Sequence, residues 1–191
     1  MRQNNKKVVG VTGGSGSGKS YLCALLKNRG YDVIDTDIIA RKVMEKGEEC
    51  LMETVAEFGE QILDNGNLNR KKLAQIVFSD EKKLAKLNEI SHKHILRCVE
   101  NMIEQSASNP VFVEGAVLIE SGFDCDLMIG VLADYEVRKE RIMKRDSMTE
   151  AEAKLRLDAQ QKDSFYIKNC DFVLTNTDGF DVDGILKRII E

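Results

Sequence analysis

Apolar residues gather in short runs that alternate with helix-like stretches along most of the chain. Several runs are apolar on consecutive positions, as in strands that are buried on both faces of a sheet. Helical patterns fill most of the intervals, which favours parallel strands with helices on both sides. The pattern therefore predicts an α/β fold with a five-stranded parallel sheet flanked by helices. The five predicted strands are residues 7–12, 31–35, 110–115, 127–133 and 171–175.

Two stretches depart from this alternation. Between residues 37 and 109 the chain shows only helical periodicity, broken by a turn at residues 64–67, which read DNGN. We expect a helical insertion there, over about residues 38–108. Later, Thr149 and Glu152 form the pattern of a capping box, which predicts the start of a new helix after an earlier helical stretch.

Composition limits the class of protein. At 191 residues, with 42% hydrophobic and 31% charged residues, the chain predicts one globular domain, residues 1–191. The net charge of −4 gives no electrostatic reason to expect nucleic acid or an anionic membrane as a partner. The five cysteines form no C-x-x-C pair, which argues against a zinc site or a disulfide framework.

The location of the protein follows from two further patterns. The first residues, MRQNNKK, lack the apolar core of a signal peptide. No apolar run approaches the ~20 residues that a membrane-spanning helix needs. We therefore expect a cytoplasmic protein with no membrane partner; the sequence does not indicate an oligomeric state.

A glycine-rich stretch, GVTGGSGSGKS at residues 10–20, lies between a predicted strand and a predicted helix. Gly13, Gly18, Lys19 and Ser20 satisfy the G-x-x-x-x-G-K-[ST] pattern of a phosphate-binding loop. Glycine suits such a loop because it allows unusual φ angles and lets backbone N–H groups approach an anion. The lysine reaches the β- and γ-phosphates, and the serine hydroxyl can ligate Mg²⁺. The sequence therefore predicts a nucleoside triphosphate site.

The glycine spacing does not fit the other common nucleotide-binding loop. A G-x-G-x-x-G fingerprint is absent, because after Gly14 and Gly16 the required third glycine is Lys19. The sequence therefore argues against a dinucleotide-binding fold and against a protein kinase, since both carry this fingerprint. The remaining alternative is a flexible glycine turn in an unrelated α/β protein.

Two carboxylates, Asp35 and Asp37, lie at the carboxyl end of the second predicted strand. The carboxyl ends of parallel strands form the ligand-binding edge of such sheets, so both side chains could face the bound phosphates. A carboxylate there can accept the proton of an attacking hydroxyl or help to hold a metal. Alternatively, Asp37 is simply the N-cap of the helix that follows. Spacing alone does not separate these interpretations.

A basic segment near residues 136–165 could cover the triphosphate. Arg138, Arg141 and Arg145 share one helical face, and Arg156 and Gln160 lie one turn apart on the next helix. Such a lid would supply positive charge to a transferring phosphoryl group, and we expect it to be mobile while its charges lack a partner. The alternative is a solvated pair of charged helices, since Glu136, Glu140 and Glu152 are interspersed.

Several of these segments occur in the same order in one enzyme family. VIDTDIIARKV, GNLNRKKLAQIVFSDEKKLAKLNEISH, RIMKRDSMTEAEAKLRLDAQ and DFVLTNTD, together with the glycine stretch, resemble the dephospho-coenzyme A kinases over nearly the whole chain. The resemblance implies a P-loop kinase core, a helical insertion for the acceptor and a helical lid. It also implies Mg²⁺-dependent transfer of phosphate from ATP to the 3′-hydroxyl of dephospho-CoA, the last step of coenzyme A synthesis.

The resemblance also implies roles for individual residues. Asp37 would be the catalytic base, assisted by Lys19, Arg141 and Arg145, and Ser20 would bind the metal. Asn176 matches a position near the ATP adenine. The nucleotide-binding candidates are Gly13, Gly14, Ser15, Gly16, Ser17, Gly18, Lys19, Ser20, Tyr21 and Asn176.

The chain departs from the family pattern at two prolines. Lys93 follows His92 where the family usually has His-Pro, so the helical pattern over residues 80–107 has no break. Ala116 begins AVLIE where the family has a Pro-Leu-Leu-Phe-Glu-like block, which alters the wall beside the expected acceptor site. His92 fits a structural role better than a catalytic one.

Two other functions remain as alternatives. A nucleoside or nucleoside monophosphate kinase would share the core, the loop and the lid, and would differ in the insertion. A P-loop switch protein that reads guanine would need an N-K-x-D motif, and the nearest stretch, TNTD, lacks the lysine.

Overall fold

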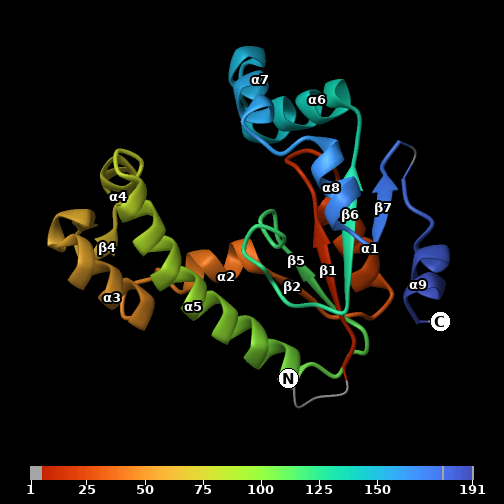
Figure 1. Cartoon of the computed structure of the whole chain (residues 1–191), viewed down its shortest axis with the longest axis horizontal. Helices are drawn as coiled ribbons and strands as arrows, with labels where there is room; N and C mark the ends of the chain where they lie inside the picture. Colours follow the sequence, from red (N-terminus) through yellow and green to blue (C-terminus); the bar gives the residue numbers. More distant parts are fainter. Residues whose placement is uncertain (1–5, 178, 191) are drawn as a thin grey trace. The chain divides into compact units, whose positions relative to one another are not determined.

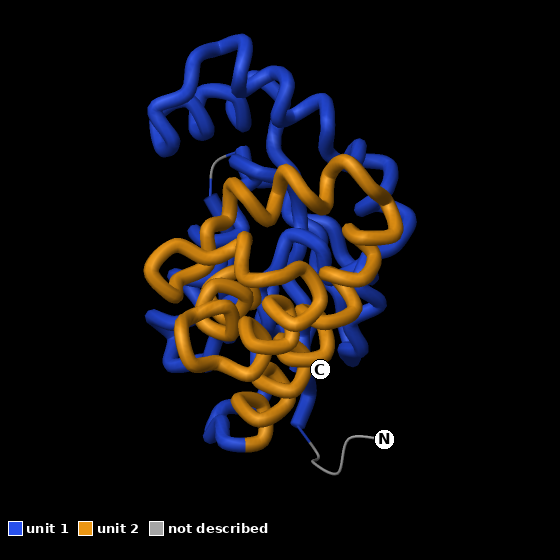
Figure 2. Tube along the Cα trace, turned by 90° about the vertical axis from the view of Figure 1, so that its left-hand side faces the viewer, with its two compact units in different colours: residues 1–35, 105–191 blue, residues 36–104 orange. Residues whose placement is uncertain are grey.

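The computed structural model describes residues 6–177 and 179–190. Residues 1–5, which contribute to the signal-peptide argument, lie outside the described part. The chain divides into two compact units (Figure 2). We call residues 1–35 and 105–191 the sheet unit, and residues 36–104 the helical unit.

The sheet unit contains a five-stranded sheet in which every neighbouring pair of strands is parallel (Figure 1). The strand order is β2-β5-β1-β6-β7. Each of the five predicted runs contains one strand, so the predicted α/β fold is confirmed. The bounds are β1 Val8–Thr12, β2 Val33–Asp35, β5 Val111–Glu114, β6 Leu127–Leu132 and β7 Phe172–Thr175.

Burial of the central strands explains their unbroken apolar runs. Every residue of β1 and β5 is buried, because helices cover both faces of a parallel sheet. On one face, Val9 and Val11 pack with α1, Lys19–Asn28, and α9, Val182–Ile190. On the other face, α8, Asp163–Asn169, packs closely on Gly130, where an added Cβ would lie 3.4 Å from Tyr166 Cβ and 2.9 Å from the Sγ of Cys170, the residue after the helix. The sheet therefore forms the middle layer of this unit.

The segment after β6 forms two helices with a small core of their own. Helix α6 covers Tyr135–Asp146 and α7 covers Glu150–Asp158. Ile142, Ala153 and Leu157 form their buried contact. The predicted capping box is confirmed, since the Thr149 side chain accepts from the Glu152 N–H and Glu152 accepts from the Thr149 N–H. Local sequence thus fixes where α7 begins.

The helical unit has a separate apolar core. Phe58, Ile62, Leu73 and Val77 form its buried cluster. The unit also contains a short hairpin that the sequence pattern did not predict, although the turn at Asn65 and Gly66 was expected and both residues have positive φ. Its elements are α2 Thr36–Lys42, α3 Glu49–Phe58, η1 Glu60–Ile62, β3 Leu63–Asp64, β4 Asn67–Leu68, α4 Arg70–Val77 and α5 Glu81–Gln105.

Helix α5 runs without interruption through His92 and Lys93. The unbroken helix expected from the missing proline is therefore confirmed, because lysine keeps the backbone N–H that proline would remove. Within residues 6–177 and 179–190, no helix combines the length and the apolar character that crossing a membrane requires.

Candidate functional site

The glycine stretch forms the turn between β1, the middle strand of the sheet, and helix α1. Gly13, Gly16 and Gly18 have φ angles of 146°, 76° and 104°, a region that side chains with a Cβ rarely adopt. Gly18 directly precedes α1, so the first backbone N–H groups of that helix face the loop. The loop therefore has the backbone geometry of an anion-binding site.

Lys19 lies across this loop. Its Nζ donates hydrogen bonds to the carbonyl oxygens of Gly13 at 2.8 Å and Gly14 at 3.2 Å. The ammonium group is thereby held beside the backbone that would surround a phosphate, where the predicted role of Lys19 requires it.

Ser20 contacts a carboxylate that was not among the sequence candidates. Its Oγ donates to Glu114 Oε1 at 2.7 Å, and Glu114 is buried at the last position of β5. In the sheet, Val11 of β1 pairs with Glu114, which brings the end of β5 beside the loop. The signal in the sequence was a carboxylate that ends an apolar strand, the same signal that drew attention to Asp35.

Behind Glu114 lies a thiol. Burial, followed by the charge and hydrogen bonding of Glu114, raises the pKa of Cys23 well above its usual range. Cys23 therefore stays protonated and donates to the carboxylate. Glu114 is consequently held between a serine hydroxyl and a thiol, in a position to offer an oxygen to a cation.

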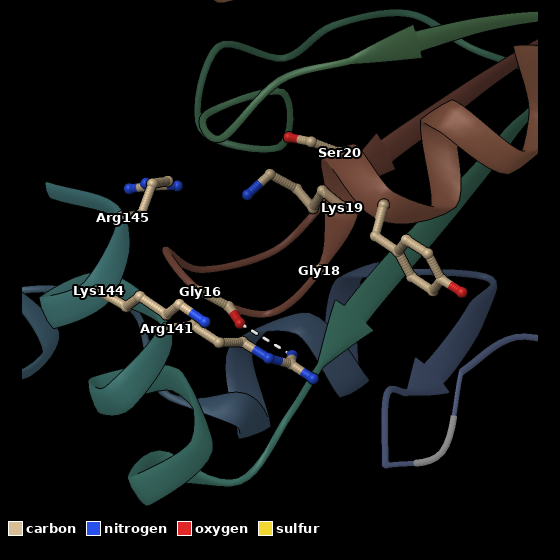
Figure 3. A pocket seen from close by; sticks show the side chains of 8 residues that line it. Gly16, Gly18, Lys19, Ser20, Arg141, Lys144 and Arg145 are labelled. Carbon is tan, nitrogen blue, oxygen red and sulfur yellow. Dashed lines mark hydrogen bonds between the residues drawn. The ribbon is translucent and has the colours of Figure 1, made fainter.

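A cavity of about 520 Å³ opens in front of the loop (Figure 3). The nitrogen-bearing ends of Lys19, Lys144 and Arg145 are turned toward this space. Lys144 was not among the sequence candidates, although it lies next to one of them. The lining residues are Gly16, Gly18, Lys19, Ser20, Tyr21, Arg141, Lys144 and Arg145. A cavity so rich in cationic groups suits a polyphosphate.

The arginines of α6 are used in different ways. Arg141 donates to the carbonyl oxygen of Gly16 at 3.1 Å (Figure 3). Arg138 donates to the carbonyl oxygen of Ser15 at 3.0 Å. Arg145 instead pairs with Asp146 at 2.7 Å and remains largely exposed. The expectation that the charges of this segment lack partners is therefore wrong, because α6 packs on the loop and the loop carbonyls accept from two of its arginines.

Asp146 also accepts a hydrogen bond from Arg156 at 2.6 Å. The hydrogen bond from Arg145 is the main cause that lowers the pKa of Asp146 to about 2, and Arg156 adds to it. This carboxylate joins the ends of α6 and α7. Arg156 thus connects α7 to α6 through Asp146, whereas Arg145 also lines the cavity.

The two candidate carboxylates at the carboxyl end of β2 belong to different units. Asp35 is the last residue of β2 and pairs in register with Glu114 of β5. Asp37 is exposed and belongs to the helical unit, within the first turn of α2. It is not the N-cap, because β2 leads directly into a helix that begins at Thr36. At this position its negative charge complements the helix dipole.

The remaining nucleotide candidates lie around the loop. Asn176 is buried, and its Nδ2 donates to the carbonyl oxygen of Ser17 at 3.0 Å. A Cβ on Gly18 would lie 2.0 Å from that nitrogen, so Gly18 is required for the contact. Tyr21 is 52% exposed at the cavity, with its ring centroid 5.9 Å from that of Phe180. Asn176 therefore supports the loop, and Tyr21 offers an aromatic face.

The residues that depart from the family pattern have ordinary contacts. Lys93 forms an ion pair with Glu53 at 2.9 Å. His94, not His92, is the buried histidine of α5, and its Nε2 lies 3.2 Å from the same carboxylate. Ala116 is half-buried, and its carbonyl oxygen accepts from Thr12 at 3.4 Å. These contacts indicate structural roles.

The parallel sheet, the loop after its middle strand and the basic cavity define the class of P-loop kinases. A family model described as dephospho-CoA kinase matches residues 7–181. The chain belongs to the dephospho-CoA kinase family, as its sequence resemblance implied.

Individual relatives agree with this membership. A dephospho-CoA kinase of Fusobacterium nucleatum is 36% identical over 95% of this chain and 94% of its own length. The crystal structure of TT1252 from Thermus thermophilus has a TM-score of 0.83, with 32% identity over 98% of this chain and 97% of that one. A dephospho-CoA kinase from Campylobacter jejuni has a TM-score of 0.61, with 25% identity over 96% and 97% of the two chains. The similarity therefore extends over both units.

Proposed function

We propose that this protein transfers the γ-phosphoryl group of ATP to the 3′-hydroxyl of dephospho-CoA, giving coenzyme A and ADP. The observation that carries the proposal is the basic cavity in front of the phosphate loop, in a chain that belongs to the dephospho-CoA kinase family. The acceptor oxygen forms a bond to the γ-phosphorus, the bond from that phosphorus to the β–γ bridging oxygen breaks, and the hydroxyl proton leaves to a base.

The loop binds the triphosphate in this proposal. Backbone N–H groups between Gly13 and Ser20 face the phosphate oxygens, and Lys19 exchanges its loop carbonyls for the β- and γ-phosphates. Arg141, Lys144 and Arg145 line the cavity on the side of α6. Their charge stabilises the phosphoryl group as it moves, because positive groups placed beside developing negative charge lower its energy.

The donor set suits Mg²⁺. Ser20 and Glu114 offer oxygen atoms, which magnesium prefers, and their side chains already meet at 2.7 Å. Among the described residues no cluster of three or more His, Cys, Asp or Glu side chains could hold a metal alone. That agrees with a magnesium ion bound chiefly through substrate phosphates and water. When bound, the ion would neutralise charge on the β- and γ-phosphates.

Asp37 is the base in this proposal. Its carboxylate is exposed at the start of α2, two residues beyond the end of β2, and the carboxyl ends of parallel strands are where ligands bind. It accepts the proton of the 3′-hydroxyl as that oxygen attacks. The helical unit, residues 36–104, binds the rest of the acceptor, and residues 136–165 act as the lid.

The test is phosphate acceptance measured as ADP release in the presence of Mg²⁺ and ATP. We expect turnover with dephospho-CoA, and much slower turnover with adenosine or AMP. Equal or faster turnover with adenosine or AMP would assign the chain to nucleoside or nucleotide phosphorylation instead. No acceleration by any of the three would contradict a small-molecule kinase. A cytoplasmic location stays a prediction.

A further inference from the structure

Ser15, at the tip of the phosphate loop, has all three of its hydrogen-bonding groups engaged by two side chains from the 136–165 segment. Its N–H donates to Gln160 Oε1 at 2.9 Å, and its Oγ accepts from Gln160 Nε2 at 2.7 Å. Its carbonyl oxygen accepts from Arg138 Nε at 3.0 Å. A residue held at every polar group has little freedom to change its backbone conformation.

The two side chains that hold Ser15 also hold each other. Arg138 Nη2 donates to Gln160 Oε1 at 2.8 Å, so one amide oxygen accepts from both the loop and the guanidinium group. Arg138 is 6% exposed, which is unusual for an arginine. Its third nitrogen, Nη1, lies 3.8 Å from Asp163 at the start of α8. We call Arg138 and Gln160 the loop clamp.

Two loop glycines are required for this contact as well as for the loop conformation. A Cβ on Gly14 would lie 2.1 Å from Arg138 Nη2, and a Cβ on Gly16 would lie 2.7 Å from the Arg138 carbonyl oxygen. Helix α6 therefore approaches the loop more closely than any residue with a side chain would allow. The conformation of the loop and the position of α6 depend on each other.

We propose that Arg138 and Gln160 are positioning residues that hold the phosphate loop in its anion-binding conformation through their hydrogen bonds to Ser15. A segment with four glycines among residues 13–18 loses much conformational freedom when it becomes ordered, and without support that cost would reduce affinity for phosphate. The loop clamp orders the loop when the protein folds, so that phosphate binding does not have to order it. This inference rests on the proposed function, because it assigns the clamp to the triphosphate site of that reaction.

The experiment compares phosphate binding by three single variants of the full chain. Gln160→Met and Arg138→Met keep much of the apolar volume of the side chains and remove their hydrogen bonds to Ser15. Lys139→Met is the matched control, since Lys139 is also buried on α6 but pairs with Glu136 and Glu150 inside the helix pair. Binding of Mg²⁺–ATP and of Mg²⁺–tripolyphosphate is measured by calorimetry, and a thermal melt is recorded for each variant.

We expect Gln160→Met to raise the Kd for both ligands by about five- to thirtyfold, because the loss of one or two net hydrogen bonds weakens binding by about that factor. Arg138→Met should have an effect of at least that size. Lys139→Met should leave both Kd values within about twofold of the parent, whatever its melting temperature, because the Lys139 ammonium pairs with Glu136 and Glu150 within the helix pair. The KM for dephospho-CoA should change little in Gln160→Met, because the loop clamp contacts the phosphate loop and is not proposed to bind the acceptor.

Near-parental binding of tripolyphosphate by Gln160→Met would overturn the proposal, and so would an equal loss in Lys139→Met. If Arg138→Met does not fold, Gln160→Met decides alone, since Gln160 is only partly buried. Tripolyphosphate binding needs no acceptor. A parent that bound tripolyphosphate but did not phosphorylate dephospho-CoA would therefore contradict the proposed function without affecting this comparison.

Discussion

The phosphate loop and the helical unit use polar residues in opposite ways. Around the loop, buried or half-buried side chains such as Arg138, Glu114 and Asn176 form hydrogen bonds to fixed partners. In the helical unit, Lys93 pairs with Glu53 and Arg97 with Glu49 at largely exposed positions. Exposed ion pairs of this kind contribute little to stability. The difference indicates that hydrogen bonds fix the positions of side chains around the phosphate loop, whereas the helical unit is held together mainly by its apolar core.

Asp37 is the exception that tests this comparison most strongly, because a proposed catalytic group lies in the helical unit. Asp37→Asn should lower kcat by about 10²–10⁴, the usual effect of losing a positioned base. Asparagine is nearly isosteric, so the fold and the affinity for ATP should survive. Turnover, a melt and an ATP titration on one preparation measure this.

The matched control for Asp37 is Asp35→Asn, which changes the carboxylate that ends β2. A melting temperature that falls together with turnover in Asp37→Asn would mean a structural role. If turnover is unchanged in Asp37→Asn but falls in Asp35→Asn, the base is Asp35, which belongs to the sheet unit. The helical unit would then contain no proposed catalytic group.

The loop lysine should give the next largest effect. Lys19→Ala removes the ammonium group held over the loop, and we expect kcat to fall by at least about 10²–10³, as for other fixed groups that stabilise developing charge. Lys27→Ala, at the exposed end of the same helix, is the control and should be nearly neutral. Near-parental turnover of Lys19→Ala would rule out a working phosphate loop.

Substitution of Glu114 should affect turnover less than substitution of Lys19. Glu114 would act on the proposed magnesium ion either directly, next to Ser20, or by orienting the Ser20 hydroxyl. Glu114→Gln should raise the Mg²⁺ concentration for half-maximal turnover by about 10–100-fold, the usual effect of a group that orients a metal ligand. Glu120→Gln, at an exposed position nearby in sequence, is the control. An unchanged magnesium titration would place the ion on other oxygens.

The smallest effect concerns acid pH and the pair of helices beside the loop. The pKa of Asp146 is lowered from 3.8 to about 2, chiefly by Arg145, so its ion pairs are complete above about pH 4 and are lost as pH falls toward 2. The difference in melting temperature between the parent and Asp146→Asn should therefore be constant above pH 4 and shrink below it. A difference that persists at pH 2 would mean that the ion pairs do not cause it.

The sequence by itself determined the features that depend on neighbours along the chain. Consecutive apolar residues predicted the strands, the spacing of Gly13, Gly18, Lys19 and Ser20 predicted the loop, and Thr149 predicted the start of α7. These succeed because backbone conformation, hydrophobic periodicity and capping each act within a few residues.

Tertiary structure decided which distant groups meet. Ser20 meets Glu114 across 94 positions only because β5 pairs with β1, and Gln160 meets Ser15 across 145 positions only because α6 and α7 fold back on the loop. The sequence placed Arg138 on the correct helical face, but it gave no sign that a loop carbonyl, not a phosphate, accepts its hydrogen bond. Sheet order and helix packing select such partners, and both are set by burial summed over the whole unit, which no local pattern contains.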